Sequence, residues 1–198
     1  MLNFDPKTNS KRLGAVILSG GRGTRMNGND KGLVQMKGKT FIETALEHIS
    51  PYTSNIVISA NRNLEQYQNL DYPVIADDSP DFSGPLAGIA RAMNIINTEL
   101  LLIFAVDIPT LPTNTIPDLM ALIDQQDTDI CCVQDGKRLQ PLISIARTEL
   151  VTDLEHYLRA GHRKVTQWFC QQKLGILEFD SDTITNINTA RELEQFSK

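Results

Sequence analysis

Short apolar segments alternate with amphipathic segments along most of this 198-residue chain. The pattern predicts strands at 13–18, 55–60, 72–77, 100–107 and 128–133, and helices at 40–49, 85–96 and 115–126. Such alternation is typical of an open, mostly parallel sheet with helices on both faces. We therefore predict the α/β class, as a single three-layer α/β/α domain with a mixed but mostly parallel, Rossmann-like sheet.

The pattern changes after residue 133. A strand containing Pro141 follows, then helices near 148–160 and 164–172, a strand ending in "GILEF" and a last helix. We interpret this part as an added layer on one continuous domain, because no linker rich in Pro, Gly or Ser marks a boundary.

The composition is typical of a soluble globular protein, with 41% hydrophobic and 22% charged residues. The formal net charge of -5 gives no reason to expect nucleic acid or an anionic membrane as a partner. No window approaches 18 uninterrupted apolar residues, so we expect no membrane span. Because Cys131, Cys132 and Cys170 form no CxxC pair and the first residues lack the apolar core of an export signal, we expect a cytoplasmic protein.

The segment "LSGGRGTRMNGNDKG", residues 18–32, directly follows the first predicted strand and holds five glycines, two arginines and a lysine. Glycines let backbone N–H groups approach a ligand, and arginine and lysine suit phosphate oxygens. Neither the GxxxxGK(S/T) loop nor the GxGxxG fingerprint is complete, because Asn29 and Asp30 replace the lysine and hydroxyl of the first and Met26 replaces the last glycine of the second. We favour a phosphate-binding loop over a merely solvated turn.

Ligands of open α/β sheets bind outside the carboxyl ends of the strands. Four segments qualify here: 18–31, 59–62, 77–84 and the residue Asp107. A carboxylate at such an edge commonly holds Mg²⁺, although "DIPTLP" also has ordinary turn chemistry. Beside a phosphate loop, the metal interpretation of Asp107 is the stronger.

Three further candidates keep two interpretations each. The aspartates of "ADDSPDFSG", from Asp77 onward, either form a turn before a helix or face a nucleotide. Asn61 in "ISANR" either caps a turn or contacts a base. The basic "RAGHRKV" segment, with Arg163 and Lys164, is either a solvated helix end or a site for a second anionic substrate.

Together these segments resemble one family, the molybdenum cofactor guanylyltransferases, within the nucleotidyltransferases of nucleotide-diphospho-sugar transferase fold. The resemblance is carried by "LSGGRGTRMNGNDKGLV", "ISANR", "VIADDSPDFSGPLAG", "AVDIPTLP", "DGKRLQPLISI", "YLRAGHRKV" and "NINTARELEQF", in family order across nearly the whole chain. It implies transfer of GMP from GTP to the phosphate of molybdopterin with Mg²⁺, and release of pyrophosphate. We divide the single domain into a flexible arm at 1–12, a nucleotide-binding part at 13–133 and a second-substrate part at 134–198.

The resemblance also assigns residues to roles. Those expected to contact GTP are Leu18, Ser19, Gly20, Gly21, Lys31, Ser59, Asn61, Asp77 and Asp107. Lys31 and Asp107, with Arg22 and Arg25, would neutralise the phosphates, and Asp107 would bind the metal. Candidates for contact with the second substrate are Arg163, Lys164, Asn186 and Asn188, although the "NINT" segment also suits the cap of the last helix.

Alternatives remain within and outside this activity. A cytidylyltransferase or a sugar-phosphate nucleotidyltransferase would share the fold, and a non-catalytic adaptor would bind the same ligands without releasing pyrophosphate. The first motif reads "LSGG", whereas relatives that use CTP tend to read LAAG, and this difference favours GTP. Possible protein partners are molybdenum cofactor insertion proteins and apo-molybdoenzymes.

Overall fold

The structure is a computed structural model that describes residues 12–20, 30–76, 84–136, 138–180, 183–187 and 189–196. It is built around a mixed sheet with β1 near its centre. Its seven strands follow the order β5-β4-β1-β6-β8-β7-β9, and the pairing is parallel except where β8 meets β6 and β7. The strands are β1 Leu13–Leu18, β4 Ile56–Ser59, β5 Val74–Ile75, β6 Leu100–Ala105, β7 Ile130–Asp135, β8 Arg138–Arg147 and β9 Leu174–Phe179. The predicted mixed, mostly parallel α/β sheet is confirmed.

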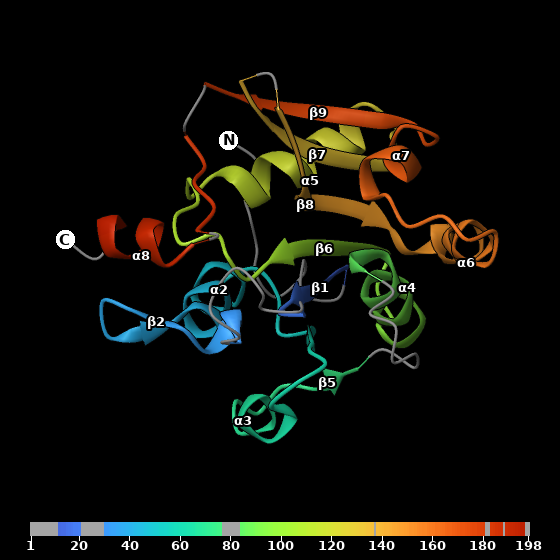
Figure 1. The fold of residues 1–198 in the computed structure, drawn as a ribbon. Helices are drawn as coiled ribbons and strands as arrows, with labels where there is room; N and C mark the ends of the chain where they lie inside the picture. Colours follow the sequence, from blue (N-terminus) through green and yellow to red (C-terminus); the bar gives the residue numbers. More distant parts are fainter. Residues whose placement is uncertain are drawn as a thin grey trace.

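Helices cover both faces of this sheet (Figure 1). On one face lie α2 Phe41–Ile49, α5 Thr115–Gln125 and α8 Ala190–Phe196, and on the other lie α4 Pro85–Ile95, α6 Val151–Arg159 and α7 Val165–Phe169. The remaining elements are the 3-10 helices η2 Lys31–Leu33 and η3 Thr148–Leu150, the hairpin β2 Gln35–Met36 with β3 Lys39–Thr40, and α3 Leu64–Gln68. Helix α3 lies next to the edge strand β5 (Figure 1).

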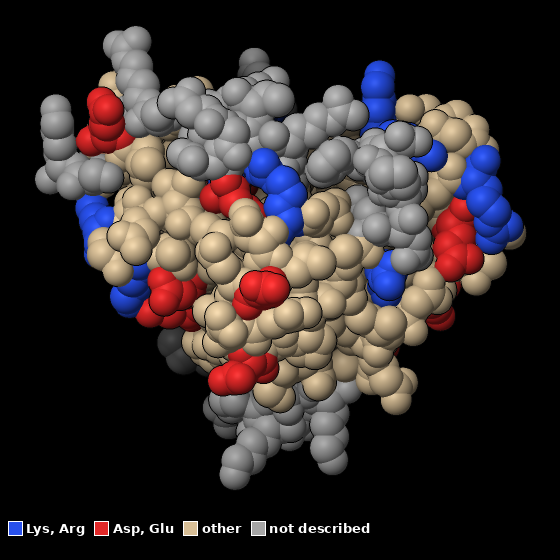
Figure 2. Space-filling view, turned by 60° about the horizontal axis from the view of Figure 1, so that its bottom comes forward, with Lys and Arg blue, Asp and Glu red and all other residues tan. Residues whose placement is uncertain are grey.

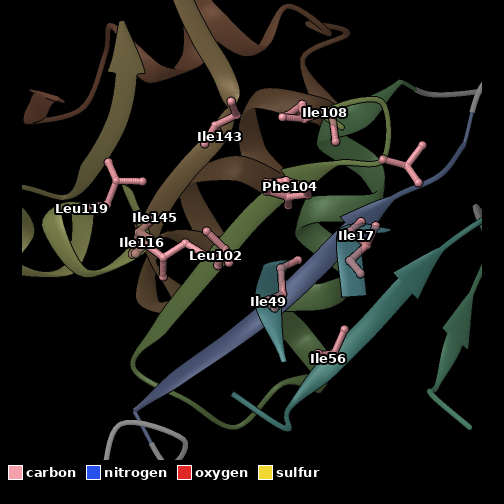
Figure 3. Packing of buried hydrophobic residues seen from close by; sticks show 14 of the residues in the cluster. Ile17, Ile49, Ile56, Leu102, Phe104, Ile108, Ile116, Leu119, Ile143 and Ile145 are labelled. Atoms are coloured by element: carbon pink, nitrogen blue, oxygen red, sulfur yellow. The ribbon is translucent and has the colours of Figure 1, made fainter. Parts of the chain in front are cut away.

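The core has two layers because the central strands are buried on both faces. Along β6, Leu102 and Phe104 face the layer of α2 and α5, whereas Leu101 and Ile103 face the layer of α4 and α6. Figure 3 shows the first of these layers, where side chains from β1, β6, β8 and α5 meet. Burial on both faces explains why these strands appear as continuous apolar runs in the sequence.

Most predicted elements are present, and the differences concern their lengths and divisions. The strand expected at 72–77 forms only at Val74–Ile75, and the helix expected at 148–160 is divided into η3 and α6. Pro141 lies inside β8 where the register with β7 shifts, since Cys132 pairs with Ser144 but Val133 pairs with Gln140. A bulge of this kind is where a sheet tolerates proline.

Acidic and basic side chains are interspersed on the face drawn in Figure 2 rather than gathered by sign. Among the residues that the structure describes, no helix combines the length and apolar character needed to cross a membrane.

The division of the chain at residues 12 and 133 stays a prediction.

Arg12, just before β1, joins the start of the sheet to two acidic side chains. Its guanidinium donates to Glu99 at 2.9 Å and to Asp124 at 2.8 Å, and Arg147 also donates to Glu99 at 3.2 Å. The hydrogen bonds from Arg12 lower the pKa of Glu99 and of Asp124. A lowered carboxyl pKa in the folded state adds stability above the unfolded-state pKa, and this stability is lost as the pH falls through the folded-state value.

We predict that Arg12→Ala lowers the free energy of unfolding by about 1 kcal/mol at neutral pH, a modest value because the carboxylates are half exposed to water. The difference from wild type should shrink between about pH 5 and pH 2, as the carboxylates become protonated. Urea unfolding across this pH range measures it. Lys173→Ala, which removes a 3.7 Å pair between exposed side chains, serves as the control; a pH-independent Arg12 effect would contradict the assignment.

Candidate active site at the carboxyl edge of the sheet

The pairing of β1 brings three predicted site segments to one edge of the sheet. Leu18, the last residue of β1, lies opposite Ser59 at the end of β4 and Ala105 at the end of β6. Ser19, Asn61 and Asp107 therefore all follow strands that end at the same level. This is the edge at which parallel α/β sheets bind their ligands.

An ion pair links the phosphate-loop segment to the end of β6. Lys31 Nζ lies 2.5 Å from Asp107 Oδ2, although the two residues are 76 positions apart in the sequence. Both side chains are partly buried, with 23% and 15% of their surfaces exposed. The structure thus places a cation and a carboxylate together at this edge, as the sequence analysis expected.

The other carboxylate oxygen of Asp107, Oδ1, differs from Oδ2 in its surroundings. Asp107 Oδ1 is buried and has no hydrogen-bond partner within the described part of the chain. A buried carboxylate oxygen without a partner is unfavourable unless a cation or a ligand group satisfies it. A metal ion or a ligand group would supply the partner that this atom lacks.

Asp30 holds the helical turn that presents Lys31. It is the N-cap of η2, and its Oδ1 accepts a hydrogen bond from the Gly32 N–H at 3.2 Å. Its Oδ2 accepts another from Asn63 Nδ2 at 3.0 Å. In the sequence, Asp30 was noted only as the residue in place of the hydroxyl of a GxxxxGK(S/T) loop, and Asn63 was not identified.

The residues at the ends of β1 and β4 have unequal access to a ligand. The Ser19 N–H donates to the Ser59 carbonyl at 2.8 Å, so this donor is engaged within the sheet. The Ser59 side chain is buried beneath α4, since a Cβ on Gly88 would lie 2.5 Å from Ser59 Oγ. Gly20 is exposed, and a Cβ on it would lie 3.6 Å from Asn61 Nδ2. Gly20 and Asn61 are therefore better placed than Ser59 to meet a nucleotide.

The C-terminal segment returns to the loop that carries Asp107. The Ile187 N–H donates to the Asp107 carbonyl at 3.1 Å, and Thr185 forms an antiparallel bridge with Thr110. Asn186, between them, has a buried Oδ1 without a hydrogen-bond partner among the described residues. The segment that holds this candidate thus contacts the backbone of the Asp107 loop.

The basic segment after α6 has a structural role that the sequence did not indicate. Arg163 donates to the carbonyls of Leu158 and His162, both at 2.7 Å, so its guanidinium caps the end of α6. Lys164 is exposed, and its carbonyl accepts a hydrogen bond from Tyr157 at 3.2 Å. The expectation that these two residues contact a second substrate stays a prediction.

Several predicted site residues lie outside the described part of the chain. They are Gly21, Arg22, Arg25, Asp77 and Asn188. Their proposed roles stay predictions. Thr189, the last residue of the "NINT" segment, forms a capping box with Glu192, with hydrogen bonds of 2.9 and 3.2 Å.

Comparisons with known proteins define the class first. A protein-family model described as "MobA-like NTP transferase domain" matches residues 15–174. A solved structure of molybdopterin-guanine dinucleotide biosynthesis protein A from Archaeoglobus fulgidus has a TM-score of 0.74 at 22% identity, covering 92% of this chain and 96% of that one. A 4-diphosphocytidyl-2C-methyl-D-erythritol synthase from Anaerococcus prevotii has a TM-score of 0.76 at 12% identity, covering 98% and 97%. The fold and the domain match make the protein a nucleotidyltransferase.

Full-length relatives define the family. A molybdenum cofactor guanylyltransferase from Shewanella halifaxensis is 35% identical over 189 residues, 94% of each chain. One from Shewanella amazonensis is 37% identical over 191 residues, which cover 96% of this chain and 97% of that protein. The chain belongs to the molybdenum cofactor guanylyltransferase family, and the resemblance noted in its sequence is confirmed.

We predict that Gly32→Ala destabilises the site, because the new Cβ would lie 2.0 Å from Ser19 Oγ and 2.3 Å from the Tyr67 hydroxyl. Overpacking of this kind costs about 1–3 kcal/mol of unfolding free energy. Thermal and urea unfolding measure it. Gly20→Ala is the matched control, because its Cβ would make only an ordinary 3.6 Å contact. Equal stability of the two variants would contradict the close packing at Gly32.

Proposed function

We propose that the protein transfers GMP from GTP to the phosphate of molybdopterin in the molybdenum cofactor, and that it releases pyrophosphate. Family membership supports the reaction. The observation that carries the assignment of the site is the ion pair between Lys31 and Asp107 at the carboxyl edge, next to the end of β1. A phosphate-binding cation and a metal-binding carboxylate are the two groups that this reaction requires in one place.

The side chains present fit a divalent metal, which we take to be Mg²⁺. Mg²⁺ prefers oxygen ligands and is usually held by one or two carboxylates together with substrate phosphates. Asp107 supplies one carboxylate with an oxygen that has no other partner, and Asn186 supplies a second buried oxygen close to it in the fold. No group of three His, Cys, Asp or Glu residues gathers within the described residues, which suits a site that substrate phosphates complete.

Charge repulsion is the main obstacle to this reaction, because the attacking group is itself an anionic phosphate. An oxygen of that phosphate forms a bond to the α-phosphorus of GTP, and the bond from the α-phosphorus to the bridging oxygen breaks, so that pyrophosphate leaves with the electron pair. Bound Mg²⁺ supplies positive charge to the phosphates. Lys31 adds a second positive charge, and it holds the phosphates in line for the displacement. No general base is required, since the nucleophile has no proton to lose.

The choice of GTP is supported by space at the end of β1. Gly20 carries no side chain beside Asn61, so no Cβ takes up space next to the Asn61 amide. Asn61 is partly exposed and its amide is suited to contact a base edge. Backbone contacts from Leu18, Ser19, Gly20 and Gly21, and contacts from Asp77, belong to the same proposal.

The rest of the proposal concerns the second substrate and the setting. We assign the molybdopterin side of the site to Asn186 and Asn188, with Arg163 and Lys164 as more peripheral contacts. Product transfer to insertion proteins or apo-molybdoenzymes, and a location in the cytoplasm, follow from the activity. Neither a nucleic acid nor a membrane is part of this proposal.

We predict that Lys31→Ala and Asp107→Asn each lower pyrophosphate release by at least about 100-fold. Lys31→Ala removes a positive charge beside the reacting phosphates, and Asp107→Asn removes the carboxylate that would hold the metal there. The measurement is pyrophosphate release with GTP and molybdopterin, repeated with CTP. Lys39→Ala and Asp118→Asn are the matched controls, since both residues lie outside the site. The wild type should strongly prefer GTP.

Three outcomes would count against the proposal. Preference for CTP would indicate a cytidylyltransferase, and turnover with a sugar phosphate in place of molybdopterin would indicate another relative of the same fold. Tight binding of GTP and molybdopterin without pyrophosphate release would indicate an adaptor.

We predict that Asn186→Ala raises the Mg²⁺ concentration for half-maximal activity by about tenfold, because a neighbouring oxygen is lost from the metal site. Pyrophosphate release at increasing Mg²⁺ measures this shift. Asn94→Ala, which removes an exposed amide from α4, is the control. An unchanged Mg²⁺ requirement with an altered KM for molybdopterin would instead place Asn186 on the second substrate alone.

A further inference from the structure

Tyr67 is a fully buried tyrosine on a short helix at the margin of the sheet. Helix α3 has five residues, and Tyr67 is its one buried side chain. Its hydroxyl lies 2.6 Å from Ser19 Oγ, and it donates to Asp30 Oδ1 at 2.6 Å. One phenol therefore contacts both Ser19, which follows β1, and Asp30, which precedes Lys31.

The direction of these hydrogen bonds follows from the number of protons. A phenol has one O–H group, and here it donates to the Asp30 carboxylate, so the Ser19 hydroxyl must be the donor in the other bond. Burial and the bond to Asp30 raise the pKa of Tyr67, which keeps its proton in place. The chain of donors from Ser19 through Tyr67 to Asp30 is therefore fixed.

Close packing leaves this chain little freedom. Gly32 lies against the Ser19 and Tyr67 hydroxyls, which a Cβ at that position would approach within 2.0 and 2.3 Å. Asp30 also accepts from the Gly32 N–H and from Asn63, so both of its oxygens are occupied. A satisfied, buried polar cluster of this kind is rigid, because any displacement leaves a buried group unpaired.

We propose that Tyr67 is a positioning residue for Lys31: its hydroxyl holds the two ends of the glycine-rich segment, at Ser19 and Asp30, and so fixes η2 with Lys31 against Asp107. The importance of Lys31 for turnover rests on the proposed function. The placement of Lys31 by Tyr67 does not, and it can be measured without any substrate.

The experiment compares full-length wild type, Tyr67→Phe and Thr53→Val. Thr53→Val is the matched control, because it also removes a buried hydroxyl, here one that donates to the Leu13 carbonyl at the opposite end of β1. Each protein is treated briefly with acetic anhydride, and acetylation of Lys31 is quantified by mass spectrometry relative to the exposed Lys39 and Lys173. Pyrophosphate release from GTP and melting temperature are measured on the same samples.

We expect Tyr67→Phe to raise Lys31 acetylation by about threefold or more, because the turn that carries it opens locally. We expect kcat/KM for GTP to fall by about tenfold, whereas Thr53→Val changes neither value even where it lowers the melting temperature. Ser19→Ala, which removes only one of the two contacts, should give a smaller rise in acetylation. If Tyr67→Phe does not fold, Ser19→Ala is the variant that tests the positioning role.

Unchanged Lys31 acetylation in these variants, or an equal rise in Thr53→Val, would overturn the positioning role whatever the activity. A selective rise in acetylation together with an inactive wild type would leave the positioning role standing and overturn the proposed function instead. The two failures are therefore distinguishable.

Discussion

Strand β1 pairs in parallel with β4 on one side and with β6 on the other, and Leu18 lies opposite residues of both. A shift by one residue on either side would turn the apolar side chains of β1 toward the wrong layer, and both layers are filled. The register is therefore determined by burial. Because Gly20, Asn61 and Asp107 follow these three strands within two residues, their common position at the edge is a consequence of how the core packs.

The core alone does not place the cation. Lys31 comes from a 3-10 turn of three residues, an element too short to be stable by itself. Its position depends on Asp30, whose carboxylate accepts from the Gly32 N–H, the Asn63 amide and the Tyr67 hydroxyl. The site thus combines a rigid apolar sheet, which sets where Asp107 lies, with a small polar cluster at its margin, which sets where Lys31 lies.

This division also explains what the sequence could predict. Strands such as 13–18 and 100–105 follow from runs of apolar residues, and Asp107 follows from chain order alone. The partners of Asp30 could not be predicted, because Tyr67 lies 37 residues away in a polar segment without helical periodicity. The inward direction of the Ser59 side chain could have been predicted from the sequence. Alternation along β4 places Ser59 on the same face as Val57, which packs in the layer of α4.

The last part of the chain also contacts the loop that carries Asp107. The nucleotidyltransferase domain match ends at residue 174, yet the Ile187 N–H donates to the Asp107 carbonyl, and Asn186, the residue before it, has a buried oxygen without a partner among the described residues. The full-length relatives extend over 94% or more of the chain and therefore reach beyond the end of the domain match. A domain cut at residue 174 would keep the pair of Lys31 and Asp107 but would lose the segment that covers the Asp107 loop. The proposed activation of the nucleotide and the proposed contact with the second substrate therefore meet at one loop, because the segment with Ile187 returns to the loop that follows β6 and carries Asp107.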